Sequence, residues 1–295
     1  MREKKMIGSS LLLFLTACIW GVAFVAQSVG MDYMEPLTFN GARFLLGGTV
    51  LLPMVFSRAA KRIKKNEGIP AYLTIKGGIC CGLAICAASL FQQYGIQRTT
   101  VGKAGFITTL YIIIVPVLGL FLHKKVPGRV WIAAAIAGAG LYLLCINESF
   151  SIGRGDTLVF ICAVLFSIHI LVIDYFSPKT DGVLLSCIQF YVAGSICTAG
   201  AFFFEQPSLE GLAAGAVPLL YAGILSCGVA YTLQIVGQKR LEPTVASLIL
   251  SVESVVSVLA GWAILGQALS ARELLGCVLV FAAVILAQVP ARRRS

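Results

Sequence analysis

Long, uninterrupted runs of apolar residues follow one another along the whole chain, separated by short polar loops. A helix needs about 20 apolar residues to cross a bilayer core roughly 30 Å thick, and ten segments reach that length. The runs do not alternate with a period of two residues, which excludes the strands of a membrane barrel. We therefore predict an all-α integral membrane protein with ten transmembrane helices. The predicted spans are 8–29, 36–57, 74–95, 101–122, 129–147, 156–175, 182–204, 212–237, 244–266 and 272–289.

The composition strengthens this prediction, because 58% of the residues are hydrophobic and only 12% are charged. An ordinary soluble domain carries about 25% charged residues. The net charge of +10 comes from Lys and Arg in the loops, so we expect a lipid bilayer rather than a nucleic acid as the partner. Of the 23 Lys and Arg residues, 18 lie on one side of the predicted membrane and 4 on the other. This asymmetry predicts a protein of the cytoplasmic (inner) membrane with both termini in the cytoplasm.

Neither a metal site nor a cofactor site is visible in the sequence. All ten Cys residues lie in apolar runs, and none forms a C-x-x-C pair or clusters with His or carboxylates at metal-ligand spacing. We interpret them as small apolar core residues. The sequence therefore predicts neither a metal nor a cofactor.

The two halves of the chain are weakly similar to each other. Residues 104–122 align with 246–264 at an offset of 142, and an Ala, an Ile and a late Gly coincide. This offset pairs the fourth predicted helix with the ninth, so each repeat holds five helices. Because five is odd, the second repeat enters the membrane from the opposite side, as in many secondary transporters. We predict a first repeat at 1–147 and a second at 148–295, arranged around a central cavity.

Motifs in a particular order and spacing indicate a family. Those of the first repeat are Trp20-Gly21, Pro36 with Arg43, and Ala104-Gly105-Phe106 leading to Pro116; those of the second are Tyr221-Ala222-Gly223-Ile224-Leu225, Ala230-Tyr231, Ser251-Val252-Glu253-Ser254-Val255 and Gly261-Trp262. With these motifs the chain resembles the ten-helix EamA branch of the drug/metabolite transporter superfamily. The resemblance implies alternating access around a central cavity, and a small substrate that is amino acid-like, nucleoside-like or drug-like. It also favours export (efflux) as the direction of transport.

Among the Asp, Glu, Lys, Arg and His residues, three lie well inside the predicted spans and away from their ends, where a charge costs roughly 2.5–3.5 kcal/mol on insertion scales. Glu253, near the middle of its helix, is interpreted either as a proton-coupling or substrate-binding carboxyl or as a structural acid. Arg43 is either a ligand for an anionic group of the substrate or a structural cation. His169 is either a proton shuttle or a packing residue.

Other polar and aromatic residues form stripes along the apolar helices. Such stripes either line a wet cavity or form hydrogen bonds between helices. We predict that they line the cavity and bind substrate together with Arg43 and Glu253. The further candidates are Trp20, Gln92, Thr108, Tyr111, Tyr231, Gln234 and Ser251.

Two other functional classes were compared with a transporter. An intramembrane enzyme needs a nucleophile or metal motif, but G-x-S-x-G and H-E-x-x-H are both absent and the chain has only two His. A membrane assembly or structural protein needs no inward polar residues, and this chain has several. The sequence therefore predicts a secondary transporter of a small metabolite, with the proton as a candidate coupling ion, and not an enzyme.

Overall fold

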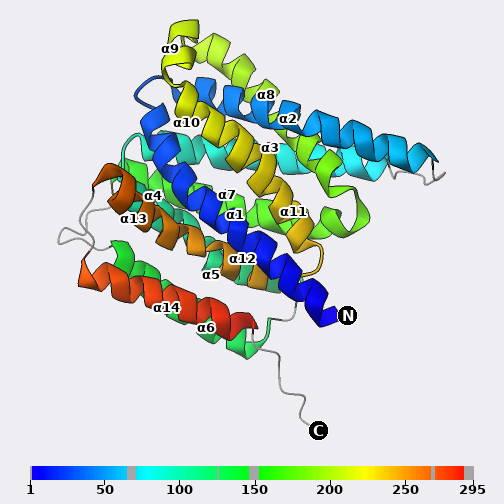
Figure 1. The fold of residues 1–295 in the computed structure, drawn as a ribbon. Coiled ribbons are helices and arrows are strands. Elements are labelled where there is room, and N and C mark those ends of the chain that lie inside the picture. Colours follow the sequence, from blue (N-terminus) through cyan, green and yellow to red (C-terminus); the bar gives the residue numbers. More distant parts are fainter. Residues whose placement is uncertain (1, 65–70, 125, 146–152, 267–269, 289–295) are drawn as a thin grey trace.

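The computed structural model describes residues 2–64, 71–124, 126–145, 153–266 and 270–288, and within these ranges it contains helices and turns but no strand. The predicted repeat boundary at 147/148 lies outside the described residues. Figure 1 shows the helices packed into one bundle. They are α1 (Arg2–Gly30), α2 (Pro36–Lys64), α3 (Ala71–Ile96), α4 (Val101–Thr109), α5 (Tyr111–Phe121), α6 (Gly128–Cys145), α7 (Arg154–Phe176), η1 (Ser177–Lys179), α8 (Gly182–Phe204), α9 (Leu209–Ala214), α10 (Ala216–Leu220), η2 (Tyr221–Tyr231), α11 (Thr232–Gln238), α12 (Pro243–Leu250), α13 (Val252–Leu265) and α14 (Ala271–Gln288).

Eight helical stretches of the described chain are long and apolar enough to cross a membrane. They correspond to eight of the ten predicted spans. The other two predicted spans coincide with α6 and α14, whose apolar parts, Gly128–Leu143 and Leu274–Ala287, are shorter. The predicted span 212–237 begins at Ala216 instead of residue 212, because residues 212–214 belong to the separate short helix α9. The all-helical fold is thus confirmed, and its eight candidate spans are consistent with an integral membrane protein.

The outside of the bundle carries many large apolar side chains. Large hydrophobic side chains stand exposed along the helices, where a soluble protein of this size would not leave so many together. Contact of such side chains with the hydrocarbon of a bilayer is favourable, whereas their exposure to water is unfavourable. The most exposed include Phe121, Phe202, Phe203, Phe204, Leu209, Val217 and Ile285.

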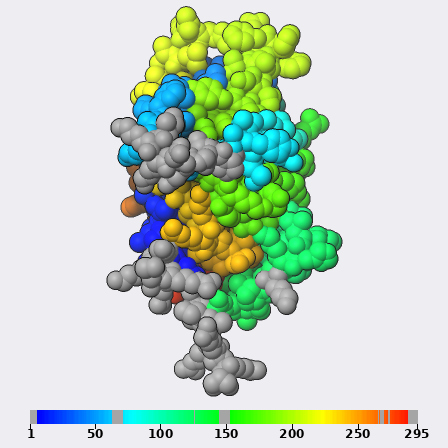
Figure 2. Space-filling view, turned by 90° about the vertical axis from the view of Figure 1, so that its right-hand side faces the viewer, coloured from blue at the N-terminus to red at the C-terminus, as the bar shows by residue number. Residues whose placement is uncertain are grey.

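The two halves of the chain do not form separate lobes. Helix α2 packs along α8, and α3 packs against both α7 and α8. Figure 2 shows this mixing on one face, where α3 in cyan lies among green and yellow-green segments of the second half. At the edge of the bundle α6 and α14 lie side by side (Figure 1). Any cavity in the centre must therefore be built by both halves.

Two of the predicted spans are interrupted at their middles. The break between α4 and α5 falls at Leu110, with φ −57° and ψ −11°, and that between α12 and α13 falls at Ser251, with φ −61° and ψ −14°. Near each break a hydroxyl donates to the carbonyl three residues back: Thr109, just before the first break, to Phe106, and Ser251, at the second break, to Leu248. Such bonds compete with the helix ladder and bend it.

A third span changes its winding instead of breaking. Its central part, η2, is π-helical, which widens the turn and occurs often at functional sites. The wider turn places Ser226 and Tyr231, five residues apart, on the same side. Helix α2 approaches this segment closely through Gly47, where an added Cβ would lie 2.6 Å from the Cys227 Cβ. A side chain at Gly47 would separate the two helices.

The N-terminus of α2 is closed by a carboxylate from the end of α8. Glu205 accepts hydrogen bonds from the backbone N–H groups of Leu37 and Thr38 and from the Thr38 hydroxyl, each at 2.7 Å. A helix leaves its first N–H groups without partners inside the helix, and a negative charge at that end is stabilising. Glu205 therefore fixes α2 to the end of α8.

We expect Glu205→Ala to lower the free energy of unfolding by about 1–3 kcal/mol, because it leaves these donors buried without an acceptor. The measurement is the melting temperature of the purified protein in detergent. Glu210→Ala, at an exposed position nearby, is the matched control and should leave the melting temperature unchanged. Equal effects of the two substitutions would contradict the capping role.

Candidate functional site

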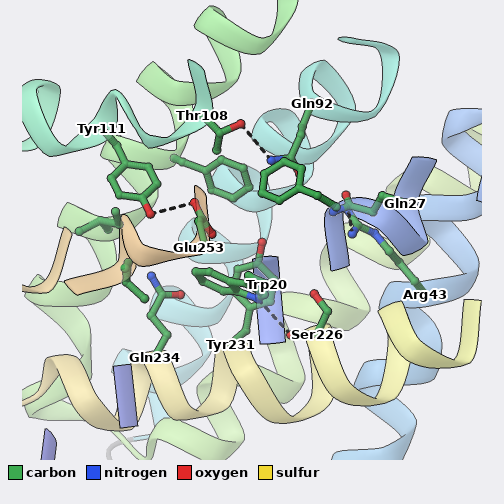
Figure 3. Close-up of a pocket in the computed structure, with 14 residues that line it drawn as sticks. Trp20, Gln27, Arg43, Gln92, Thr108, Tyr111, Ser226, Tyr231, Gln234 and Glu253 are labelled. Carbon is green, nitrogen blue, oxygen red and sulfur yellow. Dashed lines mark hydrogen bonds between the residues drawn. The ribbon is translucent and has the colours of Figure 1, made fainter. Parts of the chain in front are cut away.

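A small cavity lies between helices of both halves of the chain (Figure 3). It encloses about 30 Å³, which is enough for one or two water molecules. Its wall combines aromatic rings with amides, hydroxyls and two ionisable groups. The lining residues are Trp20, Phe24, Gln27, Arg43, Gln92, Thr108, Tyr111, Phe166, Ile170, Ser226, Tyr231, Gln234, Leu250 and Glu253.

The carboxyl group of Glu253 lies at one end of this cavity and is 3% exposed. Its Oε1 accepts a hydrogen bond of 2.8 Å from the Tyr111 hydroxyl, which reaches across from α5 (Figure 3). No basic side chain of the described chain lies within ion-pair distance of Glu253. Tyr111 and Glu253 follow the breaks at Leu110 and Ser251 by one and two residues, so the breaks bring both side chains to the centre of the bundle.

Arg43 occupies the other end of the cavity and is 1% exposed. Its Nε donates to Asn40 Oδ1 at 2.8 Å and its Nη1 donates to Gln27 Oε1 at 3.0 Å. Phe39 and Phe44 lie against the guanidinium, with ring centroids 5.6 and 4.9 Å from its central carbon. Its Nη2 has no hydrogen-bond partner among the described residues. No acidic residue of the described chain forms an ion pair with the guanidinium. Arg43, a residue of the cavity wall, thus has no counter-charge among the described residues and keeps one donor nitrogen, Nη2, without a partner.

Aromatic and amide groups connect these two ends. The rings of Trp20 and Tyr231 lie 4.5 Å apart, and the indole N–H of Trp20 donates to the Ser226 carbonyl at 3.4 Å. On the opposite side Gln92 donates to the Thr108 hydroxyl at 3.3 Å (Figure 3). Amides and hydroxyls can donate and accept hydrogen bonds, so the wall suits a polar solute with an apolar part.

The structure brings most of the predicted substrate-binding residues together in this cavity. Eight of them line it: Trp20, Arg43, Gln92, Thr108, Tyr111, Tyr231, Gln234 and Glu253. Ser251 does not line it, because its hydroxyl donates to the Leu248 carbonyl within its own helix. His169 lies behind the wall, 0% exposed, with its Nε2 3.1 Å from Gln189 Oε1. Substrate binding and proton coupling by these residues remain predictions.

Some cavity residues were missed from the sequence. Gln27 is an amide in an otherwise apolar helix, and its side chain accepts a hydrogen bond from Arg43. Its position as an isolated polar residue in that helix was the signal that could have identified it. Ser226 had no comparable signal, because only the π-helical winding of η2 places it beside Tyr231. Apolar lining residues such as Ile170 and Leu250 cannot be distinguished in sequence from other core residues.

Comparison with known proteins places this geometry in a family. The model of the EamA-like transporter family matches the chain twice, over residues 8–146 and 153–288. A protein named as an uncharacterized transporter in Archaeoglobus fulgidus is 29% identical, over 96% of this chain and 86% of that protein. The uncharacterized inner membrane transporter YedA of Escherichia coli is 25% identical, over 97% of this chain and 92% of YedA. One crystal structure shares the fold with a TM-score of 0.76 at 19% identity, over 97% of this chain and 98% of that one.

We expect Tyr111→Phe to lower stability by about 1 kcal/mol, because it removes the hydrogen bond to Glu253 inside the bundle. The same substitution made in a Glu253→Leu protein should cost less, because the acceptor is already gone. Melting temperatures of the four proteins give the coupling between the two side chains. Tyr142→Phe, at a position 52% exposed, serves as the control for loss of a hydroxyl. Additive effects would show that the bond contributes nothing to stability.

Proposed function

We propose, because this chain belongs to the EamA-like transporter family, that it is a secondary transporter of a small metabolite. In this proposal it works by alternating access in the inner membrane, with both termini in the cytoplasm and export as the direction. YedA, named as an inner membrane transporter, supports the location. The excess of Lys and Arg on one side supports the orientation.

The proposed architecture is ten spans in two inverted repeats, 1–147 and 148–295. The double match of the family model supports two repeats. The packing supports the same correspondence. Helix α1 packs on α13 and η2, and its counterpart α7 packs on α5 and α3, the counterparts of α13 and η2. In the same way α2 packs on η2, and its counterpart α8 packs on α3. The pairs α2–α8 and α6–α14 are counterparts that pack on each other. This is the pattern that two repeats related by a two-fold axis would produce.

The observation that carries the proposal is that the cavity lies where such an axis would pass. Four pairs of lining residues are 142 positions apart, the offset of the sequence repeat: Phe24 and Phe166, Gln92 and Gln234, Thr108 and Leu250, Tyr111 and Glu253. Counterparts in two repeats can bond to each other only close to the axis that relates them, and Tyr111 bonds to Glu253. A polar site on the repeat axis is the arrangement expected of a transporter built from inverted repeats.

The cavity of this structure is smaller than a metabolite requires. A metabolite of several atoms needs far more room than one or two waters occupy, so the helices must separate to admit it. The matching breaks at Leu110 and Ser251 are suitable places for that movement, because the helix ladder is already interrupted there.

The charges of the cavity indicate which groups a solute presents. The free Nη2 of Arg43 suits an anionic oxygen such as a carboxylate, and Glu253 suits a cationic group or a proton. Glu253 is therefore the proposed coupling site. Relatives that are named as transporters support a carrier without enzymatic activity over an enzyme.

A thermal-shift screen tests whether the cavity binds solutes. Amino acids, nucleosides, sugars, polyamines and drugs are added to the purified protein in detergent. At least one class should raise the melting temperature by mass action, and Arg43→Gln should abolish that rise. Glu210→Gln is the surface control. If no compound shifts the melting temperature and none gives counterflow in proteoliposomes, a membrane assembly protein becomes the better interpretation.

Proton coupling predicts a separate result in proteoliposomes. Uptake of a solute found in the screen should depend on an imposed pH gradient in the wild type. A Glu253→Gln protein should still exchange solute but should no longer respond to the gradient, because its amide cannot titrate. Concentrative, gradient-driven uptake by the Glu253→Gln protein would rule out Glu253 as the coupling group.

A further inference from the structure

The Gln27–Arg43 pair has a counterpart in the second half of the chain. His169 lies 142 positions after Gln27, on α7, the counterpart of α1. Gln189 lies as many residues after Gly182, the first residue of α8, as Arg43 lies after Pro36, the first residue of α2. Gln189 therefore occupies the position equivalent to that of Arg43. Phe44 and Phe190, the residues after Arg43 and Gln189, stack on each other with centroids 5.9 Å apart, as counterparts near a two-fold axis can.

In both pairs a side-chain nitrogen contacts an amide oxygen, which belongs to α1 in the first pair and to α8 in the second. Arg43 Nη1 lies 3.0 Å from Gln27 Oε1, and His169 Nε2 lies 3.1 Å from Gln189 Oε1. All four side chains are less than 5% exposed. Each pair also holds polar atoms without a partner among the described residues, namely Arg43 Nη2 in the first, and His169 Nδ1 and Gln189 Nε2 in the second. Buried polar groups without partners are rare in native proteins, so both pairs call for an additional ligand.

The pairs differ in their access to the cavity. Gln27 and Arg43 line it, whereas His169 and Gln189 do not. The rings of Phe166 and Tyr231 line the cavity and also contact the imidazole of His169, with centroid distances of 6.3 and 6.0 Å. The wall between the cavity and His169 is therefore a single layer of aromatic rings.

We propose that His169 and Gln189 form a second half of the solute site, which is closed here and opens when the two repeats exchange conformations. This inference rests on the proposed alternating-access function. Inverted repeats that differ in conformation can exchange their roles when the protein opens to the other side. The cavity then reaches His169 and Gln189 and withdraws from Gln27 and Arg43.

The ligand of the second half is a polar group of the same solute. Gln189 offers an amide N–H, and the imidazole offers the nitrogen that has no partner here. The guanidinium on one side is thus replaced by an amide and an imidazole on the other. A solute that carries an anionic oxygen would bind more tightly in the state that exposes Arg43.

The test uses the reactivity of His169 with diethyl pyrocarbonate in the native full-length chain, reconstituted in lipid nanodiscs and read by mass spectrometry. The chain has only two His, and the exposed His123 reports that the reagent is active. In two variants His169 is replaced by Gln, and a new His is introduced at another buried position. Gln27→His places it in the open half of the site, and Gln93→His places it at a position that is 0% exposed and outside the cavity. Ile235, the counterpart of Gln93, is also 0% exposed and outside the cavity, so Gln93→His should stay buried in both states.

We expect both His169 in the native chain and the new imidazole of Gln27→His to react, because each is open in one of two exchanging states. The imidazole of Gln93→His should react much more slowly than either.

If Gln27→His reacts but native His169 is as slow as Gln93→His, the second half-site is wrong while the cavity stands. Equal reaction of all three positions would mean general opening of the bundle and would also overturn the inference. If neither Gln27→His nor His169 reacts faster than Gln93→His, the cavity of the proposed function fails as well. Should Gln27→His not fold, Thr108→His at another lining position replaces it.

Discussion

The absence of water in the bilayer core is the constraint on which this structure depends. Every backbone N–H and carbonyl in lipid needs a partner inside the protein, which leaves helices as the way for a chain of apolar runs to cross. Polar side chains must meet the same requirement. Ser247, Ser254 and Ser257 do so by bonding carbonyls of their own helix, and they carry no functional signal. The side chains that cannot do so locally are driven to the centre of the bundle.

Some of the buried groups that keep free polar atoms lie around the cavity, whereas others, such as Ser89, Ser177 and Gln238, lie elsewhere among the described residues. Arg43, Gln189 and His169 hold donors or acceptors that no described residue satisfies, and they lie at the cavity or one ring behind it. In an apolar solvent such atoms raise the free energy of the folded chain, so they are tolerated where water or a solute completes them.

Interrupted helices give the site its geometry. A straight helix presents a narrow face to its neighbours, whereas the breaks before Tyr111 and Glu253 let two counterpart side chains meet across the bundle. The π-helical η2 adds the Ser226 carbonyl and the Tyr231 ring from a third span. Each irregularity leaves backbone groups without their usual helical partners. The protein accommodates these groups where they border a polar cavity and not where they would face lipid.

Apolar runs determined the helices and their approximate ends, because the length needed to cross a bilayer leaves little choice of structure. The motifs determined the family, and polarity within the spans was enough to find Arg43, Glu253 and six other residues of the cavity wall. The sequence alone did not separate Ser251, which bonds its own helix, from Thr108, which faces the cavity. It also gave no sign that Tyr111 and Glu253 touch, or that Gln27 shares the guanidinium of Arg43. These relations depend on helix breaks, winding and rotation, which are set by packing between segments far apart in the chain. Only the tertiary structure could decide them.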